Sequence, residues 1–241
     1  MKKILLLTVI AILAVAAFLA AGPAAEKPRI GVLRFTNHTS SSVWWNAAVG
    51  SELSDMLASE LVSTRAFQVV DRKEIDAVLG EQDLSDTDRV DKATKVKMGK
   101  LKGAKYLVAA TVSSFEESVK GTGGAVTFKG LSVGGKKEKT YIAVDLKVVD
   151  TETGEIVDSR TIEAEAKGQG LAAGLSLRNF SIQGADYQKT PTGRAIRACI
   201  IYISEYLECS MIHGTDADCM KKWDDMDRRR RDRDKGSIDI D

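Results

Sequence analysis

Residues 142–156 read Ile142-Ala-Val-Asp-Leu-Lys-Val-Val-Asp-Thr-Glu-Thr-Gly-Glu-Ile156, and this stretch decides the fold. Its first half is rich in apolar and β-branched residues, which predicts a strand that ends at Val149. Asp150 to Gly154 follows as a tight turn, in which the glycine is free to take a positive φ. Residues 156–166 then return as a second strand. The stretch therefore predicts a β-hairpin over residues 141–166.

Predicted strands and helices flank this hairpin on both sides. Apolar residues recur every three and four positions over residues 45–63, which indicates an amphipathic helix. Pro191 opens a second long helix that ends at Leu207. The other predicted elements are strands over residues 29–35, 66–70 and 104–112, helical turns over residues 72–79 and a helix over residues 90–100. The fold class is therefore α+β, followed by a charged C-terminal tail over residues 209–241.

The composition is that of a globular protein. The chain has 241 residues, of which 44% are hydrophobic and 29% are charged, so a wholly disordered chain is excluded. Lys and Arg number 35 against 34 Asp and Glu, which gives a net charge of +1. This balance argues against a nucleic-acid-binding protein, because such proteins usually have a basic excess on one face.

The first 24 residues predict a secretory signal peptide. Two lysines precede an uncharged, largely apolar run from Ile4 to Ala21, and small residues follow at the expected cleavage position. A retained transmembrane anchor is the alternative, since about 18 apolar residues can span a bilayer. No cysteine occurs before Cys199, so a lipobox is absent. Without the two lysines the net charge is 33 − 34 = −1, and we expect the mature chain in the periplasm or outer membrane.

Two segments rich in glycine and small residues, 120–139 and 167–188, interrupt the predicted strands. A structureless loop of about 20 residues is unusual inside a small domain. Each segment instead alternates apolar and polar residues, and in the second the phase flips across Arg178 and Asn179, as at a hairpin turn. The apolar set comprises Val126 and Phe128 in the first segment, and Leu171, Ala173, Leu175, Leu177, Phe180 and Ile182 in the second.

Glycine-rich alternation in an exported chain is typical of transmembrane β-hairpins whose apolar residues face lipid. The predicted spans are short, since an outer-membrane strand needs about 9–11 residues. Two hairpins cannot close a barrel alone, because lipid tolerates no unpaired strand edge, so several subunits would have to pool their hairpins. The alternative is a pair of flexible glycine-rich loops in the periplasm.

The cysteines agree with an exported protein. Cys209 and Cys219 flank turn residues, and an oxidising compartment permits a disulfide between them. A zinc site that includes His213 is disfavoured, because such sites usually have four ligands and paired Cys-x-x-Cys spacing, so no metal is expected. Cys199 lies on the apolar face of a predicted helix and is expected to be buried. The charge-dense stretch after Asp216 is expected to be a frayed helix or a solvated tail.

An ordered series of segments resembles the CsgG/HfaB family, the curli-type secretion channels of bacterial outer membranes. The segments are Gly50–Leu61, Phe67–Arg72, Ala104–Val112, Ser114–Lys120, Ile142–Asp150 and Thr153–Ile156, and they span most of residues 29–207. The resemblance implies a periplasmic mixed-sheet α/β sandwich domain over residues 25–208, with two membrane hairpins per subunit. It also implies a ring-shaped homo-oligomer whose hairpins pool into one transmembrane β-barrel.

The resemblance further implies a channel constriction just before the first long helix, with an aromatic side chain that points at the channel axis. In this chain the position falls on Trp44, Trp45 and Asn46, with Asn37 nearby. Exposed tryptophan is costly unless it packs or serves a partner, so the alternative is that both indoles pack beneath the loop. The chain departs from the best-studied branch of the family in its missing lipobox cysteine, its shorter second hairpin and the cationic residues near its hairpin tips.

The sequence does not indicate an enzyme. His38 and His213 are the only histidines, and neither lies in a nucleophile-elbow or metal motif. Gly130 to Lys137 nearly copies a phosphate-binding loop, but lysine replaces the required Ser or Thr and a strand follows instead of a helix. No cofactor is expected.

Two functions of different classes follow from the sequence. The first is a subunit of an oligomeric outer-membrane channel that exports unfolded polypeptide. Its partners would be further copies of itself, the exported polypeptide, accessory secretion proteins and the outer membrane. The second is a periplasmic or membrane-peripheral module that binds and regulates an envelope partner without forming a pore.

Overall fold

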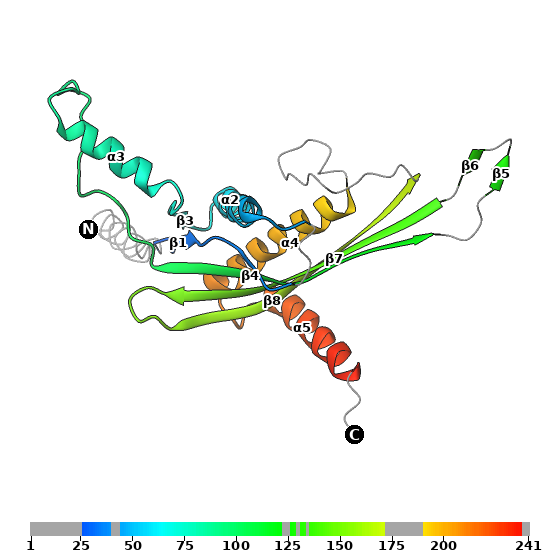
Figure 1. The fold of residues 1–241 in the computed structure, drawn as a ribbon. Coiled ribbons are helices and arrows are strands. Elements are labelled where there is room, and N and C mark those ends of the chain that lie inside the picture. The colour runs from blue at the N-terminus through cyan, green and yellow to red at the C-terminus, as the bar shows by residue number, and fades with distance from the viewer. Residues whose placement is uncertain are drawn as a thin grey trace, which may run out of the picture.

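A six-stranded mixed sheet organises the structure, a computed structural model that describes residues 26–39, 44–121, 126–128, 131–133, 135–171 and 190–237. The strands are β1 (Arg29–Val32), β2 (Thr36–Asn37), β3 (Gln68–Val69), β4 (Tyr106–Gly121), β7 (Gly135–Asp150) and β8 (Ile156–Leu171). Their order is β3–β1–β4–β7–β8, and β2 pairs with β4. The pairs made by β1 and β2 are parallel, whereas β4, β7 and β8 pair antiparallel (Figure 1).

The predicted hairpin is confirmed in β7 and β8, whose register places Leu146 opposite Arg160. The Gly154 amide closes the turn by donating to the Asp150 carbonyl oxygen at 2.8 Å. Gly154 has a φ of 75°, in the left-handed region that favours glycine. Both strands are longer than predicted, at 16 residues each. They are longer because the ladder of backbone hydrogen bonds continues into the two glycine-rich segments.

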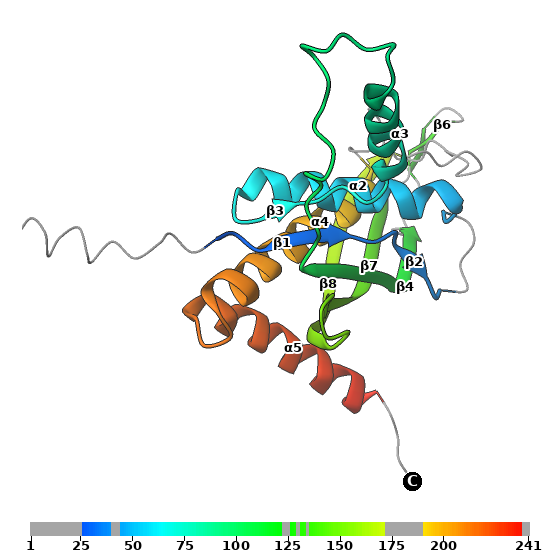
Figure 2. The ribbon, with the colours of Figure 1, turned by 90° about the vertical axis from the view of Figure 1, so that its left-hand side faces the viewer.

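Two long helices, α2 (Ala47–Thr64) and α4 (Pro191–Glu208), cover one face of the sheet (Figure 1, Figure 2). The Thr190 side chain caps α4 by accepting a hydrogen bond from the Gly193 amide. Alternate residues of β7 are buried beneath the helices, because successive side chains of a strand point to opposite faces. The core includes Leu53, Leu57 and Leu61 of α2, Ile142, Val144 and Leu146 of β7, Ile162 of β8, and Ile196, Ile203 and Leu207 of α4.

Residues 72–100 differ from the prediction. Their helix is α3 (Ile75–Asp86), which begins later than expected and runs longer. The helix predicted over residues 90–100 is wrong, because this stretch forms turns. The Asp91 carboxylate accepts a hydrogen bond from the Ala93 amide, which competes with helical hydrogen bonding. No residue of the hydrophobic core lies between positions 90 and 100, so a short helix there has no packing to stabilise it.

The charged stretch after Asp216 forms a helix, α5 (Asp218–Gly236), so of the two expectations, a frayed helix or a solvated tail, the helix is the one that these residues adopt. Met220 and Trp223 are buried. The Trp223 indole packs edge-on against the Tyr206 ring, with 5.7 Å between the ring centroids. These two apolar side chains anchor a helix that is otherwise charged, and composition alone does not reveal them.

Gly50 lets α2 approach the segment between β1 and β2. A Cβ on Gly50 would lie 2.5 Å from the Phe35 carbonyl oxygen, a backbone atom that cannot easily move away. Gly80 in α3 is the matched control, because a Cβ there meets nothing within 4 Å.

We therefore expect opposite effects from the same substitution at these two glycines. Gly50→Ala should lower the free energy of unfolding by about 1–3 kcal/mol, because the added methyl overpacks the contact. Gly80→Ala should raise it by up to about 1 kcal/mol, because alanine is the better helix former. Denaturant unfolding of both variants is the measurement, and equal stabilities would contradict the close approach of α2.

Candidate functional site

Three strands run beyond the hydrophobic core and form a projecting ribbon. Core residues lie in the first part of β4 and in the first part of β8. In β7, which runs in the opposite direction, they begin at Ile142 and occupy the second part of the strand. Beyond the core, β4 and β7 stay paired as far as Gly121 and Lys136, and β7 and β8 as far as Gly135 and Leu171. The ribbon leaves the helical layer and runs toward the right in Figure 1.

A two-stranded sheet lies at the end of the ribbon and consists of β5 (Val126–Phe128) and β6 (Leu131–Val133). Phe128 pairs with Leu131 across residues 129–130, where the sequence predicts the turn of the first hairpin. Among the residues expected to face lipid, Val126 and Phe128 lie two positions apart on β5, and Leu171 is the last residue of β8. The others, Ala173, Leu175, Leu177, Phe180 and Ile182, lie outside the described residues.

Trp44 belongs to the core, so its expected place in a channel constriction is wrong. Its side chain is only 2% exposed. The indole stacks on the Phe115 ring of β4, with 4.4 Å between the centroids and an interplanar angle of 28°. The alternative that the sequence left open, an indole packed beneath the loop, is therefore the one that Trp44 adopts.

Trp45 and the two asparagines occupy the surface beside Trp44. The Trp45 indole is half-buried and lies edge-on to Trp44, with 5.3 Å between the centroids. The Asn46 side chain caps α2 by accepting hydrogen bonds from the amides of Ala48 and Val49. The Asn37 side chain accepts a hydrogen bond from the Thr39 amide at 3.0 Å. Each asparagine thus fixes the backbone at one end of the loop, and residues 40–43 lie outside the described residues.

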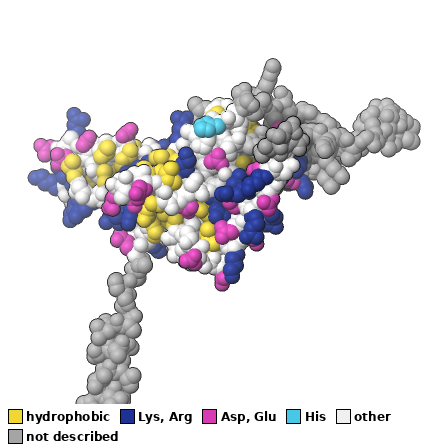
Figure 3. All heavy atoms as spheres, turned by 90° about the horizontal axis from the view of Figure 1, so that it is seen from below, with side chains coloured by type: hydrophobic (Ala, Val, Ile, Leu, Met, Phe, Trp, Pro, Cys, Tyr) yellow, Lys and Arg dark blue, Asp and Glu magenta, His cyan; other side chains and the backbone are white. Residues whose placement is uncertain are grey.

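The face of the sheet that α2 and α4 leave uncovered carries a polar groove of about 820 Å³, which the sequence patterns did not predict. It lies between β4, β7, β8 and the end of α5, where charged side chains of both signs gather (Figure 3). Glu163 accepts hydrogen bonds from the Tyr141 hydroxyl at 2.5 Å and from Arg233 at 2.7 Å. Alternating charges at Glu163, Glu165 and Lys167 are the sequence signal that marks this face.

The charges of the groove attach α5 to the sheet. Arg233 of α5 pairs with Glu163 of β8, and Arg160 of β8 pairs with Asp224 of α5 at 2.8 Å. Burial, together with the hydrogen bond to the Glu163 carboxylate, raises the pKa of Tyr141 well above its usual range. The Tyr141 hydroxyl therefore stays protonated at neutral pH and acts as a hydrogen-bond donor. These contacts have a structural role, because Glu163 is hydrogen-bonded to Tyr141 and Arg233, and Asp224 is paired with Arg160.

Two observations concern metal and membrane binding within the described ranges. There, no group of three or more His, Cys, Asp or Glu side chains is arranged to hold a metal ion. Within the same ranges, every helix is too short or too polar to cross a membrane. The signal peptide predicted over residues 1–24 lies outside these ranges.

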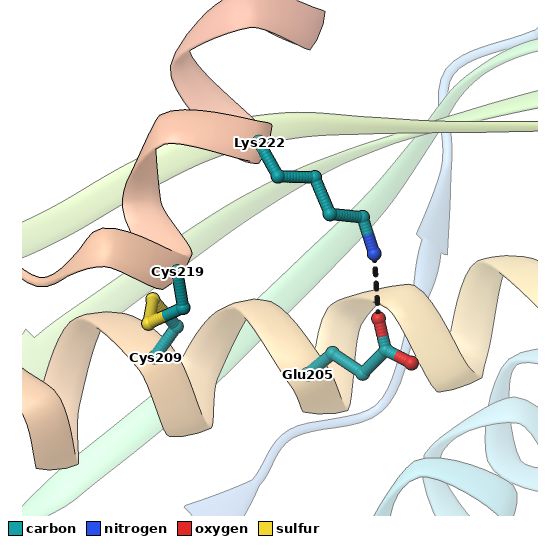
Figure 4. Close-up of a disulfide and its surroundings, with 4 residues drawn as sticks. All are labelled: Glu205, Cys209, Cys219 and Lys222. Atoms are coloured by element: carbon teal, nitrogen blue, oxygen red, sulfur yellow. Dashed lines mark hydrogen bonds and ion pairs between the residues drawn. A yellow bond between two sulfur atoms is a disulfide. The ribbon is translucent and has the colours of Figure 1, made fainter.

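A disulfide joins Cys209 to Cys219, the pair expected from the sequence, with 6.0 Å between the Cα atoms (Figure 4). Cys209 begins a π-helical turn, η3 (Cys209–His213), that extends α4, and Cys219 lies in the first turn of α5. Lys222 of α5 reaches back to Glu205 of α4 at 2.9 Å. Cys199 is a free thiol, and its burial raises its pKa to about 12, so it is unreactive.

These features define an α+β domain that extends three paired strands beyond its own core. A family model described as "Curli production assembly/transport component CsgG" matches residues 14–238. The chain therefore belongs to the CsgG family, and it is a CsgG-like envelope module. None of the curated proteins compared with the chain matches it.

Several solved structures are similar to the chain at low identity. The hypothetical protein CT253 from Chlamydia trachomatis is 17% identical, with a TM-score of 0.48, over 78% of this chain and 99% of that one. A PelC dodecamer from Paraburkholderia phytofirmans is 12% identical, with a TM-score of 0.33, over 76% of this chain and 91% of that one. The lipoprotein GNA1162 from Neisseria meningitidis is 13% identical, with a TM-score of 0.34, over 58% and 84%.

We expect the Cys209–Cys219 disulfide to form in the exported protein and to stabilise it by about 3 kcal/mol through the small loop that it closes. The Cys209→Ser/Cys219→Ser double variant should therefore unfold at lower denaturant concentration than the wild type. Alkylation of the unreduced, denatured protein should label one thiol, at Cys199. Labelling of Cys209 and Cys219 would contradict the pairing.

Proposed function

We propose that this chain is a subunit of a ring-shaped, oligomeric outer-membrane channel that exports unfolded polypeptide, such as curli-type fibre subunits. One observation carries the proposal: the strands β4, β7 and β8 stay paired well beyond the core of their own domain. Membership of the CsgG family supports a place in the cell envelope and a role in transport.

Uncharged runs of sequence follow the charged part of the ribbon. A strand of 16 residues spans about 53 Å, of which the domain core uses about half. Eight uncharged residues, 121–128, lie between Lys120 and Lys129, and ten, 168–177, lie between Lys167 and Arg178. A transmembrane strand needs about 9–11 residues, so the first arm of the second hairpin has an uncharged run of that length, whereas the return arms, 130–135 and 179–185, have shorter ones.

Oligomerisation follows from the unpaired edges of such hairpins. A strand edge in lipid leaves backbone N–H and C=O groups without partners, which costs several kcal/mol for each group. Edges of neighbouring subunits can satisfy one another if their hairpins close into one barrel. The proposed partners are therefore further copies of this chain, the exported polypeptide and accessory secretion proteins.

The channel constriction is proposed to consist of Trp45, with Asn46 and Asn37 beside it, without Trp44. Trp45 keeps exposed surface at the entrance to α2, while the Trp44–Phe115 stack beneath it provides a rigid base. The part of this half-buried indole that stays exposed suits an unfolded client, because its apolar face can contact many kinds of side chain.

A second candidate function is a membrane-peripheral module that binds an envelope partner without a pore. The uncharged window of eight residues in the first hairpin favours it, because this length falls below the usual transmembrane strand. Fractionation separates the two functions: a barrel resists carbonate washing and requires detergent, whereas a periplasmic module is released by osmotic shock.

The alternation in the second hairpin gives a matched pair of substitutions. Leu175→Arg places a charge on the proposed lipid face and should cost about 2–4 kcal/mol near the bilayer midplane. Ser176→Arg places the same charge on the proposed channel face and should be tolerated. The amount of carbonate-resistant protein is the measurement, and equal behaviour of the two variants would contradict the hairpin.

Alanine substitutions of the two tryptophans should have different effects, one on the channel conductance and the other on the stability of the fold. Trp45→Ala should raise the single-channel conductance, because the loss of an indole is repeated in every subunit of the ring. Trp44→Ala should instead lower the free energy of unfolding by about 3–5 kcal/mol, because it leaves a cavity in the core. Conductance and melting temperature measured on both variants test this, and an unchanged conductance in Trp45→Ala would refute the gate.

A further inference from the structure

Residues 75–102 form a projecting arm, which consists of α3 and the return segment Thr87–Lys102. Both ribbon views show the arm standing away from the sheet and its covering helices (Figure 1, Figure 2). The described core includes Val69 before the arm and Tyr106 after it, and no residue between these positions. The arm is therefore not held by the body of its own subunit.

The arm carries most of the exposed large hydrophobic side chains of the described chain. The described residues include eleven such side chains, and six of them lie in the 28 residues of the arm, with exposed fractions of 41–52%. The six are Val78, Leu79, Leu84, Val96, Met98 and Leu101. Six such side chains on one projecting element give a partner apolar surface to cover. Figure 3 shows hydrophobic and charged side chains interspersed on the surface of the molecule.

The two halves of the arm carry opposite charges. α3 has four acidic residues and no basic ones, a net charge of −4. The return segment has six basic residues and two acidic ones, a net charge of +4. The acids are Asp76, Glu81, Asp83 and Asp86, and the bases are Arg89, Lys92, Lys95, Lys97, Lys100 and Lys102.

These charges are available to a partner. Among the ion pairs of the described residues, none joins an acid of α3 to a base of the return segment. The arm nevertheless has a defined shape, because the buried Ser85 hydroxyl of α3 accepts a hydrogen bond from the Val96 amide at 2.9 Å. The acidic helix and the basic segment are thus two surfaces of one element.

We propose that the arm is a contact between copies of this chain, in which the acidic α3 of one copy packs against the basic return segment of the next. The exposed apolar residues would lie between them. A second copy is the favoured occupant because it alone complements both surfaces at once, whereas an acidic or a basic partner would match only one. Two different surfaces in contact make a heterologous interface, which gives a closed ring when the rotation between neighbouring copies closes.

This contact is independent of membrane insertion. The arm lies at the end of the molecule opposite to β5 and β6 in Figure 1. The arm contact therefore needs no membrane hairpin, but it shares with the proposed channel the need for an oligomer. Normal assembly of the arm variants would overturn the arm contact alone.

Charge reversal on each surface provides the test. The first variant, Glu81→Lys/Asp83→Lys, brings the net charge of α3 from −4 to 0, and the second, Lys97→Glu/Lys100→Glu, brings the net charge of the return segment from +4 to 0. All four positions are exposed. Glu152→Lys/Glu155→Lys, in the exposed β7–β8 turn, is the control with the same change of charge as the first variant. Sedimentation of the detergent-extracted full chain measures assembly, and circular dichroism checks that each variant is folded.

Each arm variant alone should assemble at least about tenfold more weakly than the wild type, because the net attraction between the two surfaces is then lost. An equimolar mixture of the two should recover assembly, because each variant complements the other at both surfaces. The control should assemble like the wild type.

Three results would overturn the proposal. They are a wild type that stays monomeric, arm variants that assemble normally, and a mixture of folded variants that fails to recover. The last result would show that the charges act within one arm, because intramolecular pairing cannot be rescued by mixing. Carbonate resistance of the same proteins tests the membrane hairpins separately.

Discussion

The continuous antiparallel pairing of β4, β7 and β8 is the constraint on which the rest of the structure depends. Inside the domain this pairing gives the helices α2 and α4 a flat apolar face to cover. Beyond the core the same ladder of hydrogen bonds continues, and the first turn of α4 still contacts it at Glu117 and Lys167. Backbone pairing holds strands together at any distance from a core, but it leaves the outer edges of the ribbon unsatisfied. If the ribbon inserts in lipid as proposed, its outer edges need a further partner, and this need connects the fold with the proposed assembly.

Much of the domain was predictable because local chemistry and packing agree there. The turn at Gly154 and the cap of α4 are set by a few neighbouring residues, so the sequence predicts the β7–β8 hairpin and the last long core helix. The same holds for α2, whose apolar repeat matches its buried face. The lengths of the strands were less predictable, because glycine-rich segments have weak strand preferences and pair here only as continuations of an existing ladder.

The errors arise where a distant contact decides the outcome. Nothing near Trp44 in the sequence indicates that Phe115, 71 positions later, stacks on its indole. The composition of α5 indicates a frayed helix or a solvated tail, yet Trp223 and a disulfide hold it against α4. Residues 90–100 have apolar residues at helical spacing, but the body of the domain offers them no surface to pack on. The sequence thus indicates which residues are apolar or charged, while their partners are fixed by the fold.

Electron microscopy of the detergent-extracted protein tests whether subunits pool their hairpins into a channel. We expect closed rings in which two hairpins from every subunit form one continuous barrel wall. We also expect the arms of neighbouring subunits to meet at the end of the ring opposite to that wall. Single subunits, or rings without a barrel wall, would contradict the proposal that this CsgG-family chain forms an export channel.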